Sequence, residues 1–260
     1  MRGITTLPVL CIAAIFAASQ FPAEVKAAGK AIELSPEDRA AIEQYLGKDV
    51  VGKAVPSNPI ADASKFFAFK DGAWIFRFAS GDKKGKTQEQ SFKALKRDKA
   101  GLTGRYANGP KDVLFLRKTD DGNISVVSEQ DLNEGVISRF SPPEPIYVSD
   151  MKPGDSKKTK IDVEVYDLSH PDHLTHSGSL DVTYSHLGAY KVTVPAGTYD
   201  AALIKWDYKG KVGPASIEDL QYRFMAAGVG VVAMVEKKNI SAMLVYHDHS
   251  KYGKVLMENK

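Results

Sequence analysis

Cysteine is almost absent from this chain: Cys11 is the only one in 260 residues. It lies inside an apolar N-terminal run, Ile4 to Ala18, which follows the positively charged Arg2. This run of about 15 residues is shorter than the ~20 that span a membrane. It predicts a secretory signal peptide over residues 1–27, cut after Val25-Lys26-Ala27. Cleavage removes Cys11, so the mature chain has no disulfide and no thiolate for catalysis or metal binding.

A lipid anchor, a second apolar run of spanning length and a strong net charge are also missing. Leu10 precedes Cys11, where lipid attachment requires a small residue. The whole chain has a formal charge of +3, and residues 1–27 hold two basic residues and one acidic residue, so the mature product is near +2. This charge is too small to indicate nucleic acid binding. We therefore expect a soluble periplasmic protein that binds no nucleic acid.

The short motifs of common enzymes are missing as well. The chain has no Gly-x-Ser-x-Gly elbow and no glycine loop of the kind that cradles a phosphate. Gly228-Val-Gly-Val lacks the third glycine and the following helix of a dinucleotide site. The sequence therefore favours a protein without catalytic residues and without a cofactor.

Alternating apolar and polar residues are what the chain has in quantity, above all from Leu187 to Glu236. Large or apolar side chains recur at every second position on both sides of the turn Pro195-Ala196-Gly197: Tyr190, Val192 and Val194, then Ala202, Ile204, Trp206 and Tyr208. The pattern returns at Leu220, Tyr222 and Phe224, with the polar Asp219, Gln221 and Arg223 between them. A period of two predicts half-buried antiparallel strands around an aromatic-rich interior.

One helix is predicted ahead of the strands. Ser35 is a helix N-cap, Pro36 suits the first helical position, and Gly47 is a stop signal. The segment Val50 to Ser64, with two prolines, predicts a connector.

Further strand signals follow at intervals of about 8–14 residues, and suggest a barrel or a sandwich of about ten to twelve short strands. Asp71-Gly72 predicts a hairpin turn, and Lys83 to Phe92 a polar edge strand. Ser141-Pro-Pro-Glu-Pro145 predicts a break in the sheet, because proline cannot continue a ladder. The tail from Ser250 to Lys260 is expected to be weakly ordered.

The segment Val192-Thr-Val-Pro-Ala-Gly-Thr-Tyr199, followed by Trp206 and Gly228-Val-Gly-Val-Val232, resembles a group of uncharacterised proteins exported by Gram-negative bacteria. They share a V-P-A-G-T-[FY] hairpin and a G-[VL]-G-[LV] strand, matched here over roughly residues 187 to 236. The resemblance implies a curved sheet similar to the half-open barrels of periplasmic lipoprotein carriers, which hold acyl chains in their concave face. The group has no assigned functional residues to transfer.

We therefore predict a mainly β fold: a curved antiparallel sheet forming an incomplete barrel, with one short N-terminal helix. The predicted organisation is a signal peptide at 1–27, a helix and connector at 28–64, and an antiparallel β domain at 65–260. The predicted function is non-catalytic binding of an apolar or amphiphilic, lipid-like partner in envelope maintenance. The candidate ligand-binding residues are the large rings of the alternating strands: Trp74, Phe76, Tyr190, Trp206, Tyr222 and Phe224. Rings of this kind also simply fill cores.

Two further functions stay open at this stage. His247 and His249 lie two apart on a predicted strand and point the same way, as in a metal-binding protein or a metal-dependent hydrolase, but no third ligand is evident. We therefore predict no metal site. The histidines between His170 and His176 match no standard zinc spacing and indicate a polar loop. The basic stretch Lys83 to Lys99 is a solvated face, or a surface for anionic lipid headgroups or another protein.

Overall fold

A computed structural model describes residues 29–60, 65–67, 70–96, 101–119, 122–242 and 246–260. The predicted signal peptide lies outside this part of the chain. In the described part, the elements follow one another as α1 (Pro36–Leu46), β1 (Val51–Val55), β2 (Gly72–Phe78), β3 (Thr87–Ala94), β4 (Gly104–Asn108), β5 (Asp112–Lys118), β6 (Ile124–Asp131), β7 (Val136–Tyr147), β8 (Ser156–Asp167), β9 (Leu174–Val194), β10 (Gly197–Val212), β11 (Ala215–Ala226), β12 (Gly230–Ala242) and β13 (Tyr246–Asn259).

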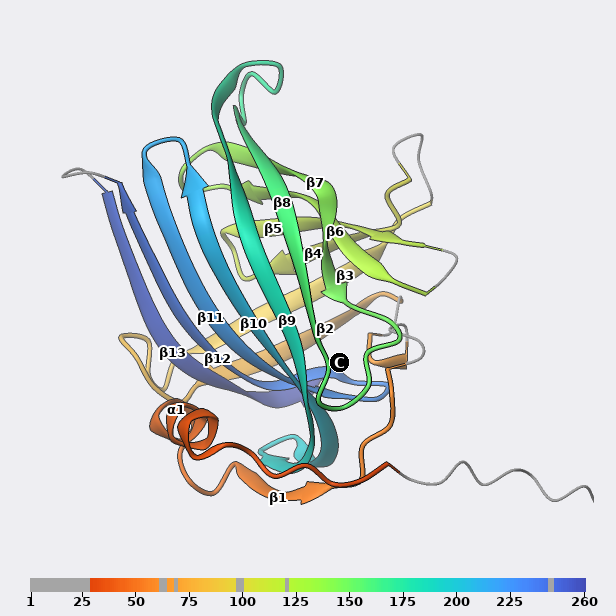
Figure 1. Ribbon diagram of the computed structural model, residues 1–260. Helices are drawn as coiled ribbons and strands as arrows, with labels where there is room; N and C mark the ends of the chain where they lie inside the picture. Colours follow the sequence, from red (N-terminus) through yellow and green to blue (C-terminus); the bar gives the residue numbers. More distant parts are fainter. Residues whose placement is uncertain (1–28, 61–64, 68–69, 97–100, 120–121, 243–245) are drawn as a thin grey trace, which may run out of the picture.

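The sheet closes on itself (Figure 1). From β2 onward each strand pairs antiparallel with the next, and β13 pairs back with β2. Among the described residues, 12 strands thereby form a closed barrel, to which β1 is added. The predicted incomplete barrel is wrong, while the mainly β fold with one helix is confirmed.

Two strands explain the closure. The 21-residue β9 has two partners along one edge, because its first half pairs with β8 and its second half with β1. The tail that we expected to be weakly ordered is β13, whose 14 residues join β12 to β2. Without β13 the sheet would indeed stay open.

Four local predictions also need correction. The predicted connector contains β1, and the predicted edge strand is β3, which has partners on both sides. Residues 66 and 67 pair with no strand, so Asp71-Gly72 precedes β2 without forming a hairpin in the described residues. The predicted break at Ser141 to Pro145 is absent, because strand β7 continues through these prolines. Its ladder with β8 ends at Ser141, and its register with β6 shifts by a bulge, so the prolines need not donate to a regular ladder.

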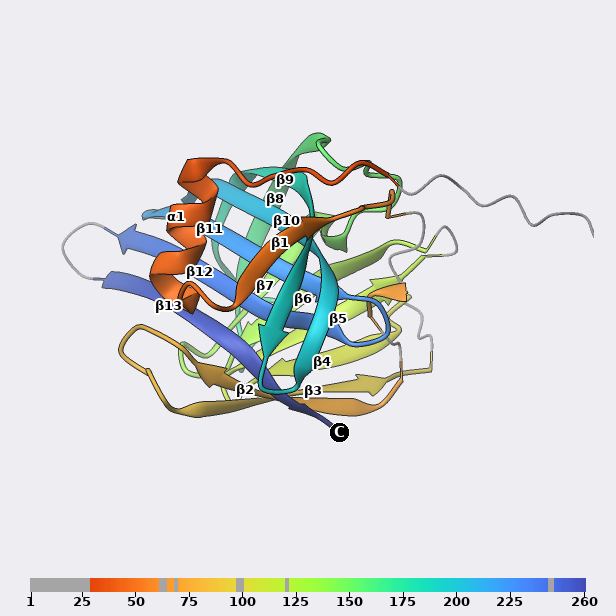
Figure 2. The same cartoon turned by 90° about the horizontal axis from the view of Figure 1, so that it is seen from below.

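The helix α1 forms where it was predicted. The Ser35 hydroxyl accepts a hydrogen bond from the backbone N–H of Asp38 at 3.1 Å, and Gly47 has a φ of 91°. Figures 1 and 2 show α1 lying across the outside of β12 and β13. A Cβ atom at Gly253 would lie 2.4 Å from the backbone oxygen of Tyr45. The helix therefore rests directly on the backbone of β13.

Candidate binding site inside the barrel

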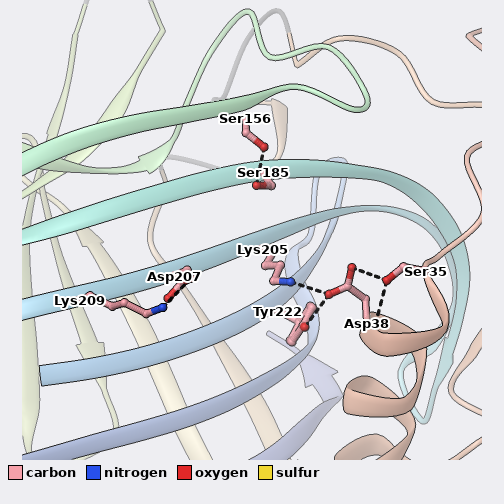
Figure 3. A network of polar contacts seen from close by, with 8 residues as sticks. All are labelled: Ser35, Asp38, Ser156, Ser185, Lys205, Asp207, Lys209 and Tyr222. Carbon is pink, nitrogen blue, oxygen red and sulfur yellow. Dashed lines mark hydrogen bonds and ion pairs between the residues drawn. The ribbon is translucent and has the colours of Figure 1, made fainter.

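The contacts of α1 show which side of the sheet faces outward. Lys205 on β10 and Tyr222 on β11 are register partners, and both bind Asp38 of α1, at 2.6 and 2.7 Å (Figure 3). Neighbouring residues on a strand point to opposite faces. Trp206 and Gln221, the next pair in register, therefore face the interior.

A hydrogen bond across the barrel confirms this orientation. The hydroxyl of Tyr208, two residues from Trp206, donates to Glu144 at 2.5 Å. Tyr208 lies on β10 and Glu144 on β7, and β8 and β9 separate these strands in the ring. The bond therefore joins side chains through the interior of the barrel.

One end of the interior is filled by aromatic rings, which we call the aromatic floor: Phe67, Trp74, Phe92, Tyr106 and Tyr147. Phe67 is at the centre, with ring centroids of the other four between 5.1 and 6.1 Å away. The indole N–H of Trp74 donates to the backbone oxygen of Val229 at 2.8 Å. Because Val229 lies in the β11–β12 turn, the floor lies at the end of the barrel that carries this turn.

The rest of the interior carries many charges. By strand register the interior also carries acidic and basic side chains, and we call nine of them the interior charge cluster: Asp112, Glu129, Asp131, Glu144, Asp219, Glu236, Arg223, Lys238 and Lys254. Most of them are half-buried, and Lys254 is 1% exposed. Six of the nine are carboxylates and three are cations.

Neutral side chains satisfy several of these carboxylates. Tyr252 donates to Glu236 at 2.7 Å, Gln221 donates to Asp219 at 2.5 Å, and Tyr208 donates to Glu144. A protein-built network of this kind holds the acids in place without pairing them with cations.

Burial shifts the ionisation of these groups. It raises the pKa of Glu129 to about 8, with the charge of Glu144 adding to the effect. Burial, followed by the nearby Glu236, raises the pKa of Asp219 to about 7. The pKa of Glu144 is raised in the same way, against the hydrogen bond from Tyr208. Burial lowers the pKa of Lys254 to about 8. The interior therefore resists full ionisation.

Arg223 is the cation with the most unusual surroundings. Its guanidinium carbon lies 3.7 Å from the centroid of the Trp206 ring. Its Nε–H and Nη2–H groups both donate to the same oxygen of Gln221, at 2.9 and 2.6 Å. Within the described residues it forms no ion pair. The guanidinium of Arg223 therefore contacts the Trp206 ring and the Gln221 amide, and not a carboxylate.

Three polar atoms beside Arg223 are buried and form no hydrogen bond with the described chain. They are the indole N–H of Trp206, one carboxylate oxygen of Asp219 and the hydroxyl of Tyr184, which lies near the hydroxyl of Tyr208. Trp206 and Tyr184 are each 1% exposed, and they are register partners on β10 and β9. Buried donors without a partner are rare, and each costs free energy.

The six candidate residues divide between the two faces. Trp74, Phe76 and Trp206 face the interior, and their role in ligand binding stays a prediction. Tyr190, Tyr222 and Phe224 lie on the outer face under α1 and the N-terminal segment. Tyr222 binds Asp38, and Tyr190 donates to the backbone oxygen of Ile32 at 2.9 Å and packs edge-to-face with Phe224. The structure does not bring the two sets together.

The interior charges were missed because both faces of β11 are covered. The alternation of Asp219, Gln221 and Arg223 with Leu220, Tyr222 and Phe224 is visible in the sequence, but we took the aromatic face as the inner one. The helix and N-terminal segment bury the aromatic face from outside, so the polar face is left to line the barrel. The signal available in the sequence was the occurrence of three charged or amide side chains, Asp219, Gln221 and Arg223, at every second position of one strand.

The histidines give no metal site in the described part of the chain. No group of three or more His, Cys, Asp or Glu residues there could hold a metal ion. His249 is opposite Asn239 on β12 and His247 is opposite Ser241, but the side chain of His247 lies outside the described part. His170 lies in an exposed turn, with its ring 3.7 Å from Asp167.

A serine–histidine pair lies outside the interior and is buried. The Ser57 hydroxyl and His186 Nε2 are 3.3 Å apart, and Nδ1 of His186 is 3.3 Å from the backbone oxygen of Met151. Ser57 is 4% exposed and His186 0%, and both have partners within the fold. The pair fastens the segment after β1 to β9.

These features define the class of protein: a closed antiparallel barrel with an aromatic floor and a charged interior. A model of the DUF3108-like family matches residues 187–244, from the second half of β9 to the end of β12. This match includes the hairpin segment on which the resemblance to exported proteins was based. No curated protein matches the chain.

The chain also matches solved bacterial structures at low sequence identity. One, from Bacteroides fragilis NCTC 9343, is described as an exported protein with a YmcC-like fold; it is 14% identical, with a TM-score of 0.44 over 78% of this chain and 99% of that one. Another, described as a lipoprotein from Parabacteroides distasonis ATCC 8503, is 14% identical, with a TM-score of 0.33 over 79% and 100%. The hypothetical lipoprotein YmcC from Escherichia coli K12 is 9% identical, with a TM-score of 0.40 over 76% and 89%.

The described residues include no helix with the length and apolar character of a membrane span.

Proposed function

We propose that this protein is a non-catalytic binding protein of the bacterial periplasm, which holds an amphiphilic, lipid-like molecule inside its barrel. The observation on which this rests is the division of the interior into an aromatic floor and a charged region with unpartnered donors. An amphiphile has the same division into an apolar chain and a polar head.

The size of the barrel supports the proposal. An eight-stranded barrel is just wide enough for its own side chains or one small ligand, and the diameter grows with strand number. The 12 strands of the described chain therefore enclose more space than an eight-stranded barrel does. Half-buried charges such as Glu129 and Arg223 retain accessible surface on side chains that face inward.

The two tryptophans of the chain provide a direct test, because both Trp74 and Trp206 face the interior. Delipidated protein is titrated with a fatty acid that carries bromine atoms on its chain, which quench tryptophan emission at contact range. We expect saturable quenching, with one equivalent of lipid bound in native mass spectra. Trp74→Phe and Trp206→Phe variants show which end of the interior the chain reaches.

A matched control reports binding to the outside. In the variant Trp74→Phe/Trp206→Phe/Leu174→Trp, the tryptophan stands at a position that is 46% exposed at the edge of β9. We expect its emission to be unaffected. The proposal is wrong if the parent protein shows no saturable quenching, or if the control is quenched equally.

A further inference from the structure

We propose that the ligand's polar head is a carboxylate, held by the guanidinium of Arg223 together with the indole N–H of Trp206 and the hydroxyl of Tyr184. This inference rests on the proposed function and names the head group that the interior recognises.

The position of Arg223 is the first argument. Its guanidinium lies inside a barrel that holds the six carboxylates of the interior charge cluster, yet within the described chain it pairs with none of them. Burying a cation without an anionic partner is costly. Stacking on Trp206 and two hydrogen bonds to one Gln221 oxygen fix the plane of the guanidinium. These hydrogen bonds use its Nε–H and one Nη2–H group. A planar guanidinium binds a carboxylate through paired N–H groups.

The second argument is the chemistry of the neighbouring unpartnered groups. The indole N–H of Trp206 can only donate, and the hydroxyl of Tyr184 can donate. Both residues are 1% exposed, and they stand opposite each other on the inner faces of β10 and β9. Trp206 is also the register partner of Gln221, two residues from Arg223 on β11. Three donors on adjacent strands therefore await an acceptor in the same region.

The surrounding carboxylates do not act as the anionic partner of Arg223 in place of the ligand. Glu144, Asp219 and Glu236 accept hydrogen bonds from Tyr208, Gln221 and Tyr252, so neutral side chains of the protein already hold them. One oxygen of each of these carboxylates is engaged in this way, while the second oxygen of Asp219 is not, and a cationic head would meet the charge of Arg223. The donors beside Arg223 favour an anionic head over a cationic one.

The apolar part of the ligand would lie among apolar side chains. Val182 on β9 and Ile161 and Val163 on β8 face inward beside Tyr184. On the other side, Arg223 lies near Tyr106 and Tyr147 of the aromatic floor, whose pKa values respond to its charge. Apolar and aromatic side chains therefore flank Arg223 on both sides.

The test compares three probes with the same alkyl chain: a fatty acid, a fatty alcohol and an alkylamine. Each probe's affinity is measured by displacement of the brominated fatty acid from parent protein and from Arg223→Gln, Arg223→Lys and Trp206→Phe variants. We expect the parent to bind the acid about ten- to a hundredfold more tightly than the amine. Arg223→Gln should remove that preference and leave the alcohol's affinity unchanged. Arg223→Lys should keep part of the preference for the acid that Arg223→Gln loses. Trp206→Phe should weaken binding of the acid several-fold.

Lys209→Gln is the matched control, since Lys209 lies on the outer face of the same strand as Trp206, 67% exposed and 3.7 Å from Asp207 (Figure 3). It should leave all three affinities unchanged. Equal or tighter binding of the amine by the parent, or an unchanged preference in a folded Arg223→Gln or Trp206→Phe protein, would overturn the carboxylate assignment while the proposed function stands. Absence of binding by all three probes would overturn both.

Discussion

Glu129 shows what the closed barrel does to a single charge. It faces the interior from β6, opposite Leu114 on β5, and burial raises its pKa to about 8. The unfolded chain releases this proton near the ordinary value of 4.5. Between these two values the unfolded state binds fewer protons than the folded state, so the folded state loses stability as the pH rises.

The variant Glu129→Gln removes this titration and keeps the shape of the side chain. We expect it to melt at nearly the parent temperature at pH 4.5, and to become progressively more stable than the parent up to about pH 8. A shift of several degrees at pH 8.5 is expected, given roughly 2–4 °C per kcal/mol for a chain of this size. Thermal melts by circular dichroism measure it.

The control for this prediction is Glu218→Gln, which changes an exposed carboxylate on the outer face of β11. Its melting temperature should follow the parent at every pH. A pH-independent shift for Glu129→Gln would show that Glu129 ionises normally in the folded protein.

At the scale of elements, one polar cluster fastens α1 to the barrel. Burial alone would raise the pKa of Asp38, but hydrogen bonds from Lys205, Tyr222 and Ser35 outweigh burial and hold it below its usual value. Lys205 and Asp38 are partly shielded, with side chains 27% and 13% exposed. The cluster therefore joins the helix to two strands more than 160 positions away.

Asp38→Asn should destabilise the protein by about 1–3 kcal/mol, because it leaves Lys205 without its anionic partner in a partly buried site. Urea unfolding at pH 7 measures the change. Asp200→Asn is the matched control, since it breaks the exposed ion pair with Lys191, whose atoms lie 2.8 Å apart on the same sheet. It should cost less than about 1 kcal/mol. Equal losses in the two variants would contradict the anchoring role of Asp38.

The elements differ in how well the sequence predicted them. The helix was found because its capping signals, Ser35, Pro36 and Gly47, act through neighbouring residues. The hairpin of β9 and β10 was predicted because apolar and polar residues alternate on both sides of the turn Pro195-Ala196-Gly197. β13 was missed because its inner face holds Tyr252 and Lys254, and only the interior network around them makes these residues core. The prolines of β7 predicted a break in the sheet, because the bulge that accommodates them cannot be recognised from neighbouring residues in the sequence.

At the scale of the molecule, the seam between β13 and β2 closes the barrel, because these two strands are the ends of the run of consecutive pairings. Arg77 and Val255 are register partners across this seam. Both face outward, since Val255 follows the inward-facing Lys254. An open sheet would separate β13 from β2. A cross-link at this pair therefore reports closure in solution.

The variant Arg77→Cys/Val255→Cys should form an intramolecular disulfide readily on mild oxidation, since the mature chain is expected to hold no other cysteine. Loss of free thiols and mass spectrometry of the linked peptides measure it. In the control Arg77→Cys/Lys251→Cys the second position is four residues along β13 from Val255, about 13 Å away. Efficient cross-linking of this control, or none of the first pair, would contradict the closed seam.

The sequence by itself determined the helix, the β class and the strands of the hairpin region, because these depend on composition and on patterns among neighbouring residues. The export signal, which lies outside the described residues, stays a prediction. It also placed Trp74, Phe76 and Trp206 among the candidate residues. It could not determine which face of each strand points inward, because a period of two is the same for both faces. Only the tertiary structure decided that: α1 and the N-terminal segment cover one face from outside, and β13 joins β12 to β2, so Arg223 and its polar neighbours become the interior of a closed barrel.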